Sequence, residues 1–368
     1  MRVTRLKKLF VIGLLVLLVV QFASHTSAEI VNLYDYQTLV VTQDRSERNQ
    51  ATRDGLAEVI LRASGQLAVL QDPSILGALS SPSRYLLEFR YEATDETLDV
   101  DGKPTPAWRL ILKFSQESVT KLLRDRQLSI WPANRPSVLV WLVMDDGRGP
   151  LIASSASQPA LFDVITESAV QRGVPIVLPL MDLEDQVALS AQSAWQLDED
   201  AIARASERYQ ADSILVGRLT QTSRGDWRSA WQLKHRDGFD VFDINSEDIL
   251  EIIGAGVNQT ADYFFSLYGY QPSGNASERV IMQVADVRHF QDYVSLLNYL
   301  RGLAIVRGVD VSVALGNYLL LSVETEADVK LLQDAIALDS RMLPEPVQAV
   351  ATVPPGQPEN PLKYVWQN

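Results

Sequence analysis

The 368-residue sequence contains no cysteine. A chain without cysteine forms no disulfide and offers no thiol nucleophile or thiolate metal ligand. It also has no cysteine through which a lipid could be attached. The folded state must therefore depend on a hydrophobic core, for which this length and 46% hydrophobic residues suffice. The length indicates two or three domains.

Histidine is nearly as scarce, with three in the chain. His25 belongs to the N-terminal segment described below, which leaves His235 and His289. These two lie far apart in the sequence, and neither has a second ligand at helical spacing. We therefore expect no metal site and interpret both as structural or surface side chains.

Basic residues are fewer than acidic ones, 33 against 46, and the net charge is -13. The first 28 residues hold four basic side chains and no acidic one, so their removal lowers the net charge to -17. A chain this acidic repels the phosphates of nucleic acids and of anionic lipids. Nucleic acid is therefore not an expected partner.

Familiar catalytic and nucleotide-binding motifs are also missing. No G-x-S-x-G, H-E-x-x-H or Walker-type loop occurs. Gly254 and Gly256 form a fragment of a dinucleotide fingerprint, but they lie within a helical pattern and indicate close helix packing instead. We expect no cofactor. Catalysis by carboxylates often leaves no local signature, so an enzyme is not excluded.

The first 28 residues have the pattern of a signal peptide. The basic start MRVTRLKK precedes the apolar run LFVIGLLVLLVV, and small residues follow at Thr26 and Ala28. The run is shorter than the roughly 20 apolar residues that span a bilayer. We therefore expect cleavage after Ala28, no membrane insertion afterwards, and a periplasmic protein. The alternative is an uncleaved segment that anchors the protein to the inner membrane.

The remaining chain predicts three small units of α/β and α+β type, of which residues 29–132 form the first. After an initial strand, DRSERNQATRDGLAEVILRASG predicts a helix that ends at its glycine. Strands are expected at Arg84–Ala93 and Trp108–Phe114, around the turn-rich stretch VDGKPTP. SQESVTKLLRDR predicts a short helix capped by its serine. The two prolines of WPANRP mark the boundary with the next unit.

The middle unit, residues 136–270, predicts a mixed sheet with helices on both faces. SVLVWLVM shows no alternation of apolar and polar residues, which is typical of a strand buried on both faces. In WRSAWQLK, Trp227 and Trp231 share one face of a strand. We expect the following helix to cover them with a continuous apolar stripe: Leu250, Ile253, Val257, Ala261, Phe264 and Tyr268.

The last unit, residues 278–343, follows a linker at residues 271–277. Its order of strands and helices is βαββα, with a tight turn at Gly316-Asn317 and a possible last strand near Met342. This order is typical of a ferredoxin-like module. Residues 344–368 contain six prolines and few large apolar side chains, so we expect a disordered tail.

Four stretches carry a resemblance to a known family: DGLAEVILRASG, RPSVLVWLVMD, YQADSILVGRL with DWRSAWQL, and FQDYVSLLNYLRGL. Together they resemble the exported proteobacterial family known as domain of unknown function (DUF) 2066. The likeness covers nearly the whole mature chain and implies no reaction, cofactor or catalytic residue. The middle unit also resembles envelope accessory domains of the Tol N-terminal, curli-secretion and penicillin-binding-protein-activator types. That second resemblance implies binding to other envelope proteins.

The loop MDDGRGP is the candidate functional site. It leaves the carboxyl end of a buried strand, where open α/β sheets place their ligands. Asp145 and Asp146 could hold a hard cation and Arg148 an anion or a partner, although the spacing is not that of a calcium loop. The alternative is a glycine turn with solvated charges.

These observations favour a non-enzymatic adaptor or accessory protein that binds other cell-envelope proteins. The lack of a nucleophile motif, of paired histidines and of a cofactor fingerprint all support this interpretation. The alternative is a periplasmic hydrolase that uses carboxylates in a cleft between the units.

Overall fold

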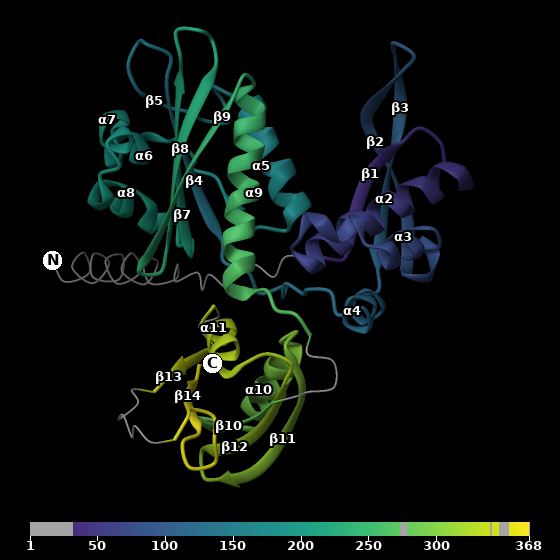
Figure 1. Cartoon of the computed structure of the whole chain (residues 1–368), viewed down its shortest axis with the longest axis vertical. Coiled ribbons are helices and arrows are strands. Elements are labelled where there is room, and N and C mark those ends of the chain that lie inside the picture. The colour runs from purple at the N-terminus through teal and green to yellow at the C-terminus, as the bar shows by residue number, and fades with distance from the viewer. Residues whose placement is uncertain (1–31, 273–277, 339–340, 346–352, 368) are drawn as a thin grey trace, which may run out of the picture.

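The protein is described by a computed structural model that covers residues 32–272, 278–338, 341–345 and 353–367. The predicted signal peptide lies outside the described residues, as does most of the predicted linker. The described chain contains three sheets, each with its own helices, so the structure is mixed α/β and α+β as predicted (Figure 1).

The N-terminal unit contains an antiparallel sheet in the order β1-β3-β2. Its elements are β1 (Asp35–Val40), α2 (Arg45–Ser64), α3 (Pro73–Leu79), β2 (Leu86–Val100), β3 (Lys103–Phe114) and α4 (Gln116–Asp125). The apolar face of the predicted helix α2 (Leu56, Val59, Ile60 and Ala63) is buried against this sheet. Gly65 ends α2 at a φ of 74°, a left-handed conformation that glycine adopts easily. The hydroxyl of Ser115 caps α4 as predicted.

The hairpin β2–β3 is longer than the sequence pattern indicated. Both strands continue through the VDGKPTP stretch to a two-residue turn at Asp101-Gly102, where both φ angles are positive (54° and 76°). Asp-Gly is a preferred pair for such a turn. Pro104 and Pro106 are tolerated because β1 pairs with β3 only from Trp108 onward, so no third strand needs a hydrogen bond from either proline.

The middle unit contains a mixed sheet in the order β5-β4-β7-β8-β9, with β6 beside β4. Its strands are β4 (Val138–Asp145), β5 (Leu151–Ile152), β6 (Ile176–Val177), β7 (Ser213–Gln221), β8 (Trp227–His235) and β9 (Gly238–Ser246). β4 runs parallel to β6 and β7, and the other pairs are antiparallel. Seven of the eight residues of β4 are buried, as expected for a strand covered on both faces.

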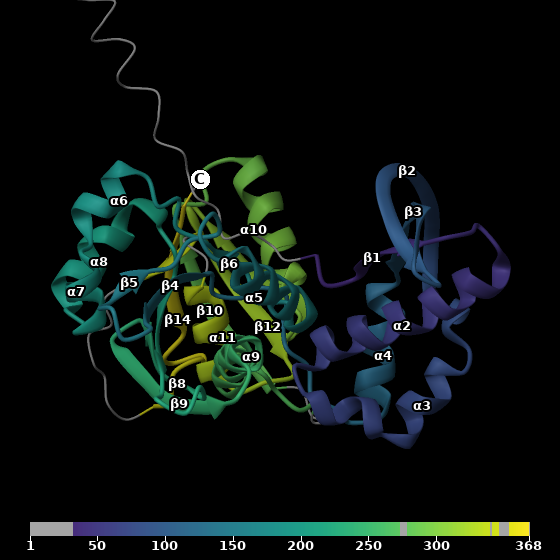
Figure 2. The same ribbon diagram turned by 90° about the horizontal axis from the view of Figure 1, so that it is seen from above.

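Helices cover both faces of this sheet, which confirms the prediction. One face packs against α5 (Pro159–Arg172) and α9 (Ile249–Tyr268). The other packs against α7 (Ala191–Trp195) and α8 (Glu199–Ser206), and α6 (Leu183–Ala188) lies against α8. Figure 2 shows α5 and α9 between the sheet and the N-terminal unit, with α6, α7 and α8 on the opposite side.

The C-terminal unit contains a sheet in the order β11-β12-β10-β14-β13. Its elements are β10 (Glu278–Ala285), α10 (Phe290–Gly302), β11 (Val306–Leu315), β12 (Tyr318–Thr325), α11 (Val329–Ala337), β13 (Met342–Pro344) and β14 (Leu362–Trp366). The βαββα order and the central antiparallel pair β10–β12 are those of a ferredoxin-like module. In such a module the last strand lies beside the first. Here β13, the strand expected near Met342, pairs with β14 at the sheet edge, and β14 is the strand beside β10.

The prediction of a disordered tail is wrong for residues 353–367. β14 pairs in parallel with β10 and antiparallel with β13, so the end of the chain completes the sheet. Leu362, Tyr364 and Trp366 are buried, and they alternate with less buried neighbours. This period of two is typical of a strand, and burying three large side chains outweighs the local proline content.

A buried arginine joins the N-terminal and middle units. The side chain of Arg135 is almost fully buried, and all five of its N–H groups donate to main-chain carbonyls. Those acceptors are the carbonyls of Arg62, Trp131, Pro132, Arg172 and Gly173. The carbonyls come partly from the C-terminal ends of α2 and α5, where the helix dipole attracts a cation. Burial lowers the pKa of Arg135, and these carbonyls offset the loss of hydration.

A second polar cluster joins the N-terminal and C-terminal units. Arg124 of α4 donates to the buried carboxylate of Glu326 at 3.0 Å, and Tyr270 donates to the same oxygen at 3.2 Å.

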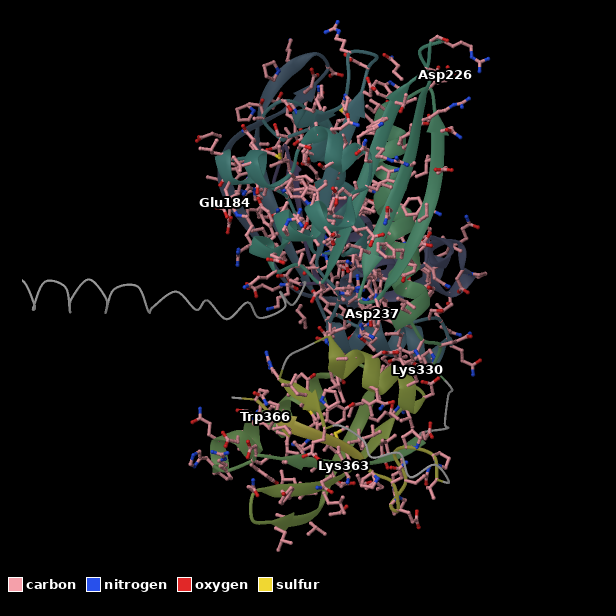
Figure 3. The ribbon with its side chains drawn as sticks, turned by 90° about the vertical axis from the view of Figure 1, so that its left-hand side faces the viewer. Glu184, Asp226, Asp237, Lys330, Lys363 and Trp366 are labelled. Carbon is pink, nitrogen blue, oxygen red and sulfur yellow. The ribbon has the colours of Figure 1, made fainter. Side chains whose placement is uncertain are left out.

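An ion pair joins the middle and C-terminal units. Arg236, in the turn between β8 and β9, pairs with Asp334 of α11 at 2.9 Å. Figure 3 shows the neighbouring Asp237 and Lys330 where the middle and C-terminal units meet. Polar contacts therefore connect all three units.

Candidate functional site

The loop predicted as a site folds onto itself. One oxygen of Asp145 accepts hydrogen bonds from the backbone N–H groups of Gly147 (2.8 Å) and Gly149 (3.1 Å). Asp146 accepts from the backbone of Arg148 at 3.2 Å, and their side chains are 3.8 Å apart. The loop joins β4 to β5 and is exposed. These contacts account for the acidic side chains as turn formers, and contact with a partner through this loop remains a prediction.

The fold brings a serine and a histidine together, but in the core. Ser213 and His235 lie directly opposite each other on β7 and β8, with Oγ and Nδ1 2.7 Å apart. The Nε2 atom of His235 lies 2.6 Å from the hydroxyl of Tyr268, and all three side chains are buried. Burial lowers the pKa of His235, with a smaller contribution from Arg236. A substrate has no access to this serine, so the pair is structural, as predicted for this histidine.

A cavity of about 770 Å³ lies between the N-terminal sheet and α5. Gln37, Ile111 and Arg90 form one row across β1, β3 and β2 on the sheet side. Glu167 and Gln171 of α5 line the opposite side. The alternative hypothesis from the sequence, a hydrolase, requires a cleft of this kind between two units.

Two carboxylates of this cleft already have partners. Glu58 accepts from the buried Arg62 at 2.9 Å, and Asp35 accepts from the amide of Asn32. Burial raises the pKa of Tyr36 and lowers that of Arg62. A general acid and base would need two carboxylates free to exchange protons with a substrate. These contacts support a structural role for Glu58 more than a catalytic one.

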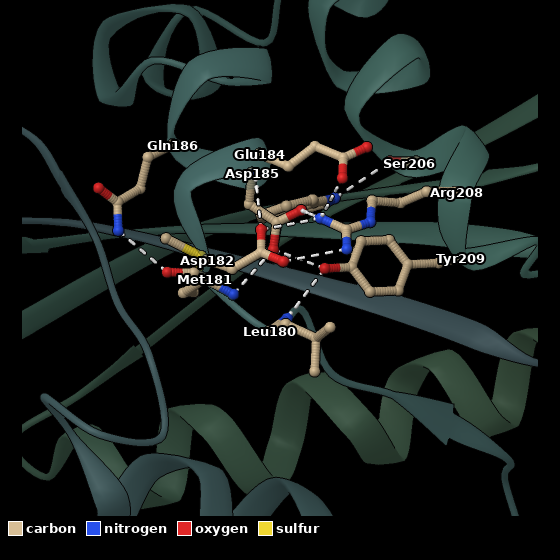
Figure 4. Close-up of polar contacts among 10 residues, drawn as sticks. Leu180, Met181, Asp182, Glu184, Asp185, Gln186, Ser206, Arg208 and Tyr209 are labelled. Carbon is tan, nitrogen blue, oxygen red and sulfur yellow. Dashed lines mark hydrogen bonds and ion pairs between the residues drawn. The ribbon is translucent and has the colours of Figure 1, made fainter.

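A polar cluster of hydrogen bonds and ion pairs lies at α6 (Figure 4). The carboxylate of Asp185 is buried, and one oxygen accepts from the backbone of Met181 (2.7 Å) and from the hydroxyl of Tyr209. Its other oxygen accepts from Arg208 at 3.1 Å. The Tyr209 hydroxyl in turn accepts from the backbone of Leu180 at 2.9 Å.

Arg208 connects this cluster to the start of α6. It donates to both oxygens of Asp182, at 2.8 and 3.0 Å, and lies 3.5 Å from Glu184. The bidentate hydrogen bond lowers the pKa of Asp182 to about 2. Burial, together with the hydrogen bond to Asp185, raises the pKa of Tyr209 to about 12. These bonds fix the position of α6 relative to the turn Glu207–Tyr209 that follows α8 and to the segment that follows β6.

The segment held in this way presents large apolar side chains to solvent. Leu180, Leu183 and Val187 are 71%, 76% and 79% exposed, and we call these three residues the α6 face. Leu183 and Val187 lie four residues apart and share one side of α6. Leu180 lies in the segment just before this helix. Glu184, the next residue after Leu183, lies on the outer surface of the middle unit (Figure 3). A fixed, exposed apolar surface is typical of a protein-binding site.

The α6 face was not among the residues singled out from the sequence. The spacing of Leu183 and Val187 is typical of the apolar stripe of a helix, and such a stripe is normally buried. Acidic residues such as Glu184 and Asp185 are common at a helix start, which accounts for Glu184 but not for the burial of Asp185. The partner of Asp185 is Arg208, 23 residues later, and no local pattern connects the two.

Comparison with known proteins places one part of the chain. Residues 27–132 match a family model described as a domain of unknown function (DUF8605), which covers the N-terminal unit. A search among curated proteins finds no match. Within the described residues, no helix is long and apolar enough to cross a membrane, and no group of three or more histidines and acids is placed to hold a metal ion.

Proposed function

We propose that the protein is a non-enzymatic adaptor of the bacterial cell envelope that binds an exported partner protein through the α6 face. The observation that carries this proposal is the rigid exposure of Leu180, Leu183 and Val187 above the Arg208 cluster. Apolar side chains this exposed are unfavourable in water, and a partner that covers them gains about 25 cal/mol for each Å² buried.

The chemistry of this surface defines the partner. Glu184 is 70% exposed beside the apolar residues, and the whole chain carries a net charge of -13. A segment with apolar side chains flanked by lysine or arginine complements both features. We therefore propose a basic, apolar segment of another exported protein as the occupant of the α6 face.

The cellular setting of the proposal rests on the sequence. The N-terminal pattern of a signal peptide supports export to the periplasm, or anchoring to the inner membrane if the segment is kept. The resemblance to the DUF 2066 family and to envelope accessory domains supports a role among envelope proteins. The match of residues 27–132 adds an uncharacterised domain and no activity.

Crosslinking in cells tests the adaptor function. A photoreactive amino acid at Val187 should capture an exported protein, whereas one at Leu76, 55% exposed on α3, should not. A synthetic peptide from the captured region should contain apolar and basic residues and bind the purified protein. The substitutions Leu183→Glu and Val187→Glu should together lower the affinity for that peptide by about tenfold or more without changing the melting temperature of the protein.

Three results would contradict this proposal. Equal capture at Val187 and Leu76 would indicate general stickiness. Capture of a second copy of the same chain would make the α6 face a dimer contact. A captured peptide whose binding survives the double substitution would place the partner elsewhere.

A hydrolase remains the second candidate because one observation favours it. The cleft of about 770 Å³ is lined by both units and contains Asp35, Glu58 and Glu167. If the purified protein cleaves an envelope glycan, Glu167→Gln should abolish the reaction, and Glu184→Gln, outside the cleft, should leave it unchanged. Equal rates in both variants would exclude this cleft.

A further inference from the structure

A second cavity lies where the helices of the middle unit leave the sheet uncovered. The core beneath α6, α7 and α8 takes its buried strand residues from β4 and β7, so β8 and β9 extend beyond these helices. A cavity of about 400 Å³ occupies this region. Its lining includes Trp195, Arg218, Arg228, Ala230, Asp243 and Asn245.

Strand register determines how these side chains are placed. Arg218 of β7 lies opposite Ala230 of β8, which in turn lies opposite Asp243 of β9. The next row on the same face consists of Thr220, Arg228 and Asn245. Arg218 and Arg228 are therefore diagonal neighbours, roughly 7–8 Å apart at the backbone and within reach of one group between their side chains. The small side chain of Ala230 leaves space between them.

The two guanidinium groups have unused donors. Arg228 is exposed, and its side chain makes no hydrogen bond or ion pair with the described residues. Arg218 donates from Nη1 to the carbonyl of Trp195 at 3.0 Å, and its buried Nε finds no acceptor among them. Guanidinium groups bind carboxylates and phosphates through paired N–H groups. The net charge of the chain, -13, opposes an external anion, so the attraction must come from these two neighbouring guanidinium groups.

The wall of the cavity supplies an apolar contact. Trp195 of α7 is half-buried, and the Arg218 guanidinium lies 5.9 Å from the centroid of its ring. An indole at the edge of a cavity provides a flat surface for a ring of the ligand. Thr220 and Asn245 offer further hydrogen bonds, whereas Asp243 repels an anion and limits its affinity.

We propose that this cavity binds a small anionic ligand in which a carboxylate or phosphate is attached to a flat apolar ring. Arg218 and Arg228 hold the anionic group, and the ring lies against Trp195. The site is separate from the α6 face, so the two can be tested independently.

Titration calorimetry on the purified full chain tests the site with three probes. Benzoate carries a carboxylate, phenyl phosphate a phosphate, and benzamide has the ring without the charge. At least one anion should bind, and benzamide should bind at least tenfold more weakly, because it cannot form charge-assisted hydrogen bonds with the two arginines. The anion that binds more tightly identifies the chemistry of the ligand.

Four variants separate a site from a general effect of charge. Arg228→Gln should lower the affinity for the anion by about tenfold, and Ala230→Phe should block the cavity without a change in charge. Asp243→Asn should strengthen binding, because it removes the opposing charge. Arg224→Gln is the matched control, since Arg224 is 78% exposed on the neighbouring turn and pairs with Asp226. It should leave the affinity unchanged.

The proposal fails if benzamide binds as well as the anions, or if no probe binds. It fails equally if Arg224→Gln and Arg228→Gln weaken binding to the same extent, since that would show attraction by overall charge. Melting curves confirm that each variant is folded. Should Ala230→Phe not fold, the opposite effects expected for Arg228→Gln and Asp243→Asn still decide the question.

Discussion

Trp231 is the residue around which the middle unit packs. Its indole is 1% exposed, stacks on Phe242 with ring centroids 6.2 Å apart, and donates to Ser229 at 2.8 Å. Gly217 of β7 and Gly256 of α9 lie on either side of the ring. A side chain at either position would begin only 2.5–2.6 Å from the ring carbons, closer than non-bonded carbon atoms pack. Glycine at positions 217 and 256 therefore makes room for the indole of Trp231.

A pair of glycines on α9 tests this packing. Gly256→Ala should lower the free energy of unfolding by about 1–3 kcal/mol, because the new methyl group displaces Trp231. Gly254→Ala, two positions earlier on the same helix, meets only Ser168 at 3.4 Å and Val164 at 3.6 Å, and should be neutral or stabilise by up to about 1 kcal/mol. Denaturant unfolding measures both. Equal effects of the two substitutions would show that Trp231 does not require the glycine.

Single residues differ in how far the sequence predicts them. The interpretation of Gly256 as a packing position is confirmed, because its place within a helical pattern is a local property. The pairing of Ser213 with His235 and of Asp185 with Arg208 could not be predicted, since each depends on elements that meet only in the folded chain. No local signal distinguishes a buried aspartate from an exposed one in the sequence Glu184-Asp185.

At the scale of elements, α9 and β14 show where a sequence pattern succeeds and where it fails. The apolar stripe of α9 is long, and its predicted contact with the tryptophan strand is confirmed. β14 has only five residues and follows a proline-rich stretch. The prediction of disorder relied on that composition and missed the alternation of apolar residues in the strand. The length of the hairpin β2–β3 was underestimated for the same reason. Pro104 and Pro106 argued against a strand, but β1 does not reach this part of β3, so the prolines are tolerated there.

Truncation before β14 tests its role in the sheet. A chain that ends at Pro361 loses the buried side chains of Leu362, Tyr364 and Trp366. It should therefore lose several kcal/mol of stability in the C-terminal unit, at about 1.5–3 kcal/mol for each large side chain. Lys363→Ala, an exposed position on the same strand, should change stability by less than about 0.5 kcal/mol. Thermal unfolding of both chains decides whether β14 is part of the cooperative core.

At the scale of the whole molecule, arginines join three units that each have their own sheet. The apolar core of the N-terminal unit belongs to the same cluster as that of the C-terminal unit, and Arg124 bonds to Glu326 across the two. The middle unit is joined to the first by Arg135 and by Arg172, which donates to the carbonyl of Gly65 at 3.1 Å. The sequence predicted three units but not these contacts, because arginines near a unit boundary are ordinarily solvated. These junctions fix the positions of the three units relative to one another.

The last prediction concerns Arg135 and the cooperativity of the molecule. Arg135→Met keeps a long side chain but removes all five donors, so five main-chain carbonyls lose a partner in a buried site. Stability should fall by about 3–5 kcal/mol. Arg135→Lys should recover only part of the loss, because an ammonium group has three donors and no planar fork.

Arg90→Met serves as the control, since the side chain of Arg90 is 59% exposed and should be nearly neutral. Calorimetry should show one transition for the wild-type protein and two for Arg135→Met, because the N-terminal and middle units then melt separately. Limited proteolysis should at the same time begin near residues 132–136. A single transition at the original temperature would mean that the carbonyls find other donors and that the apolar contacts alone hold the units together.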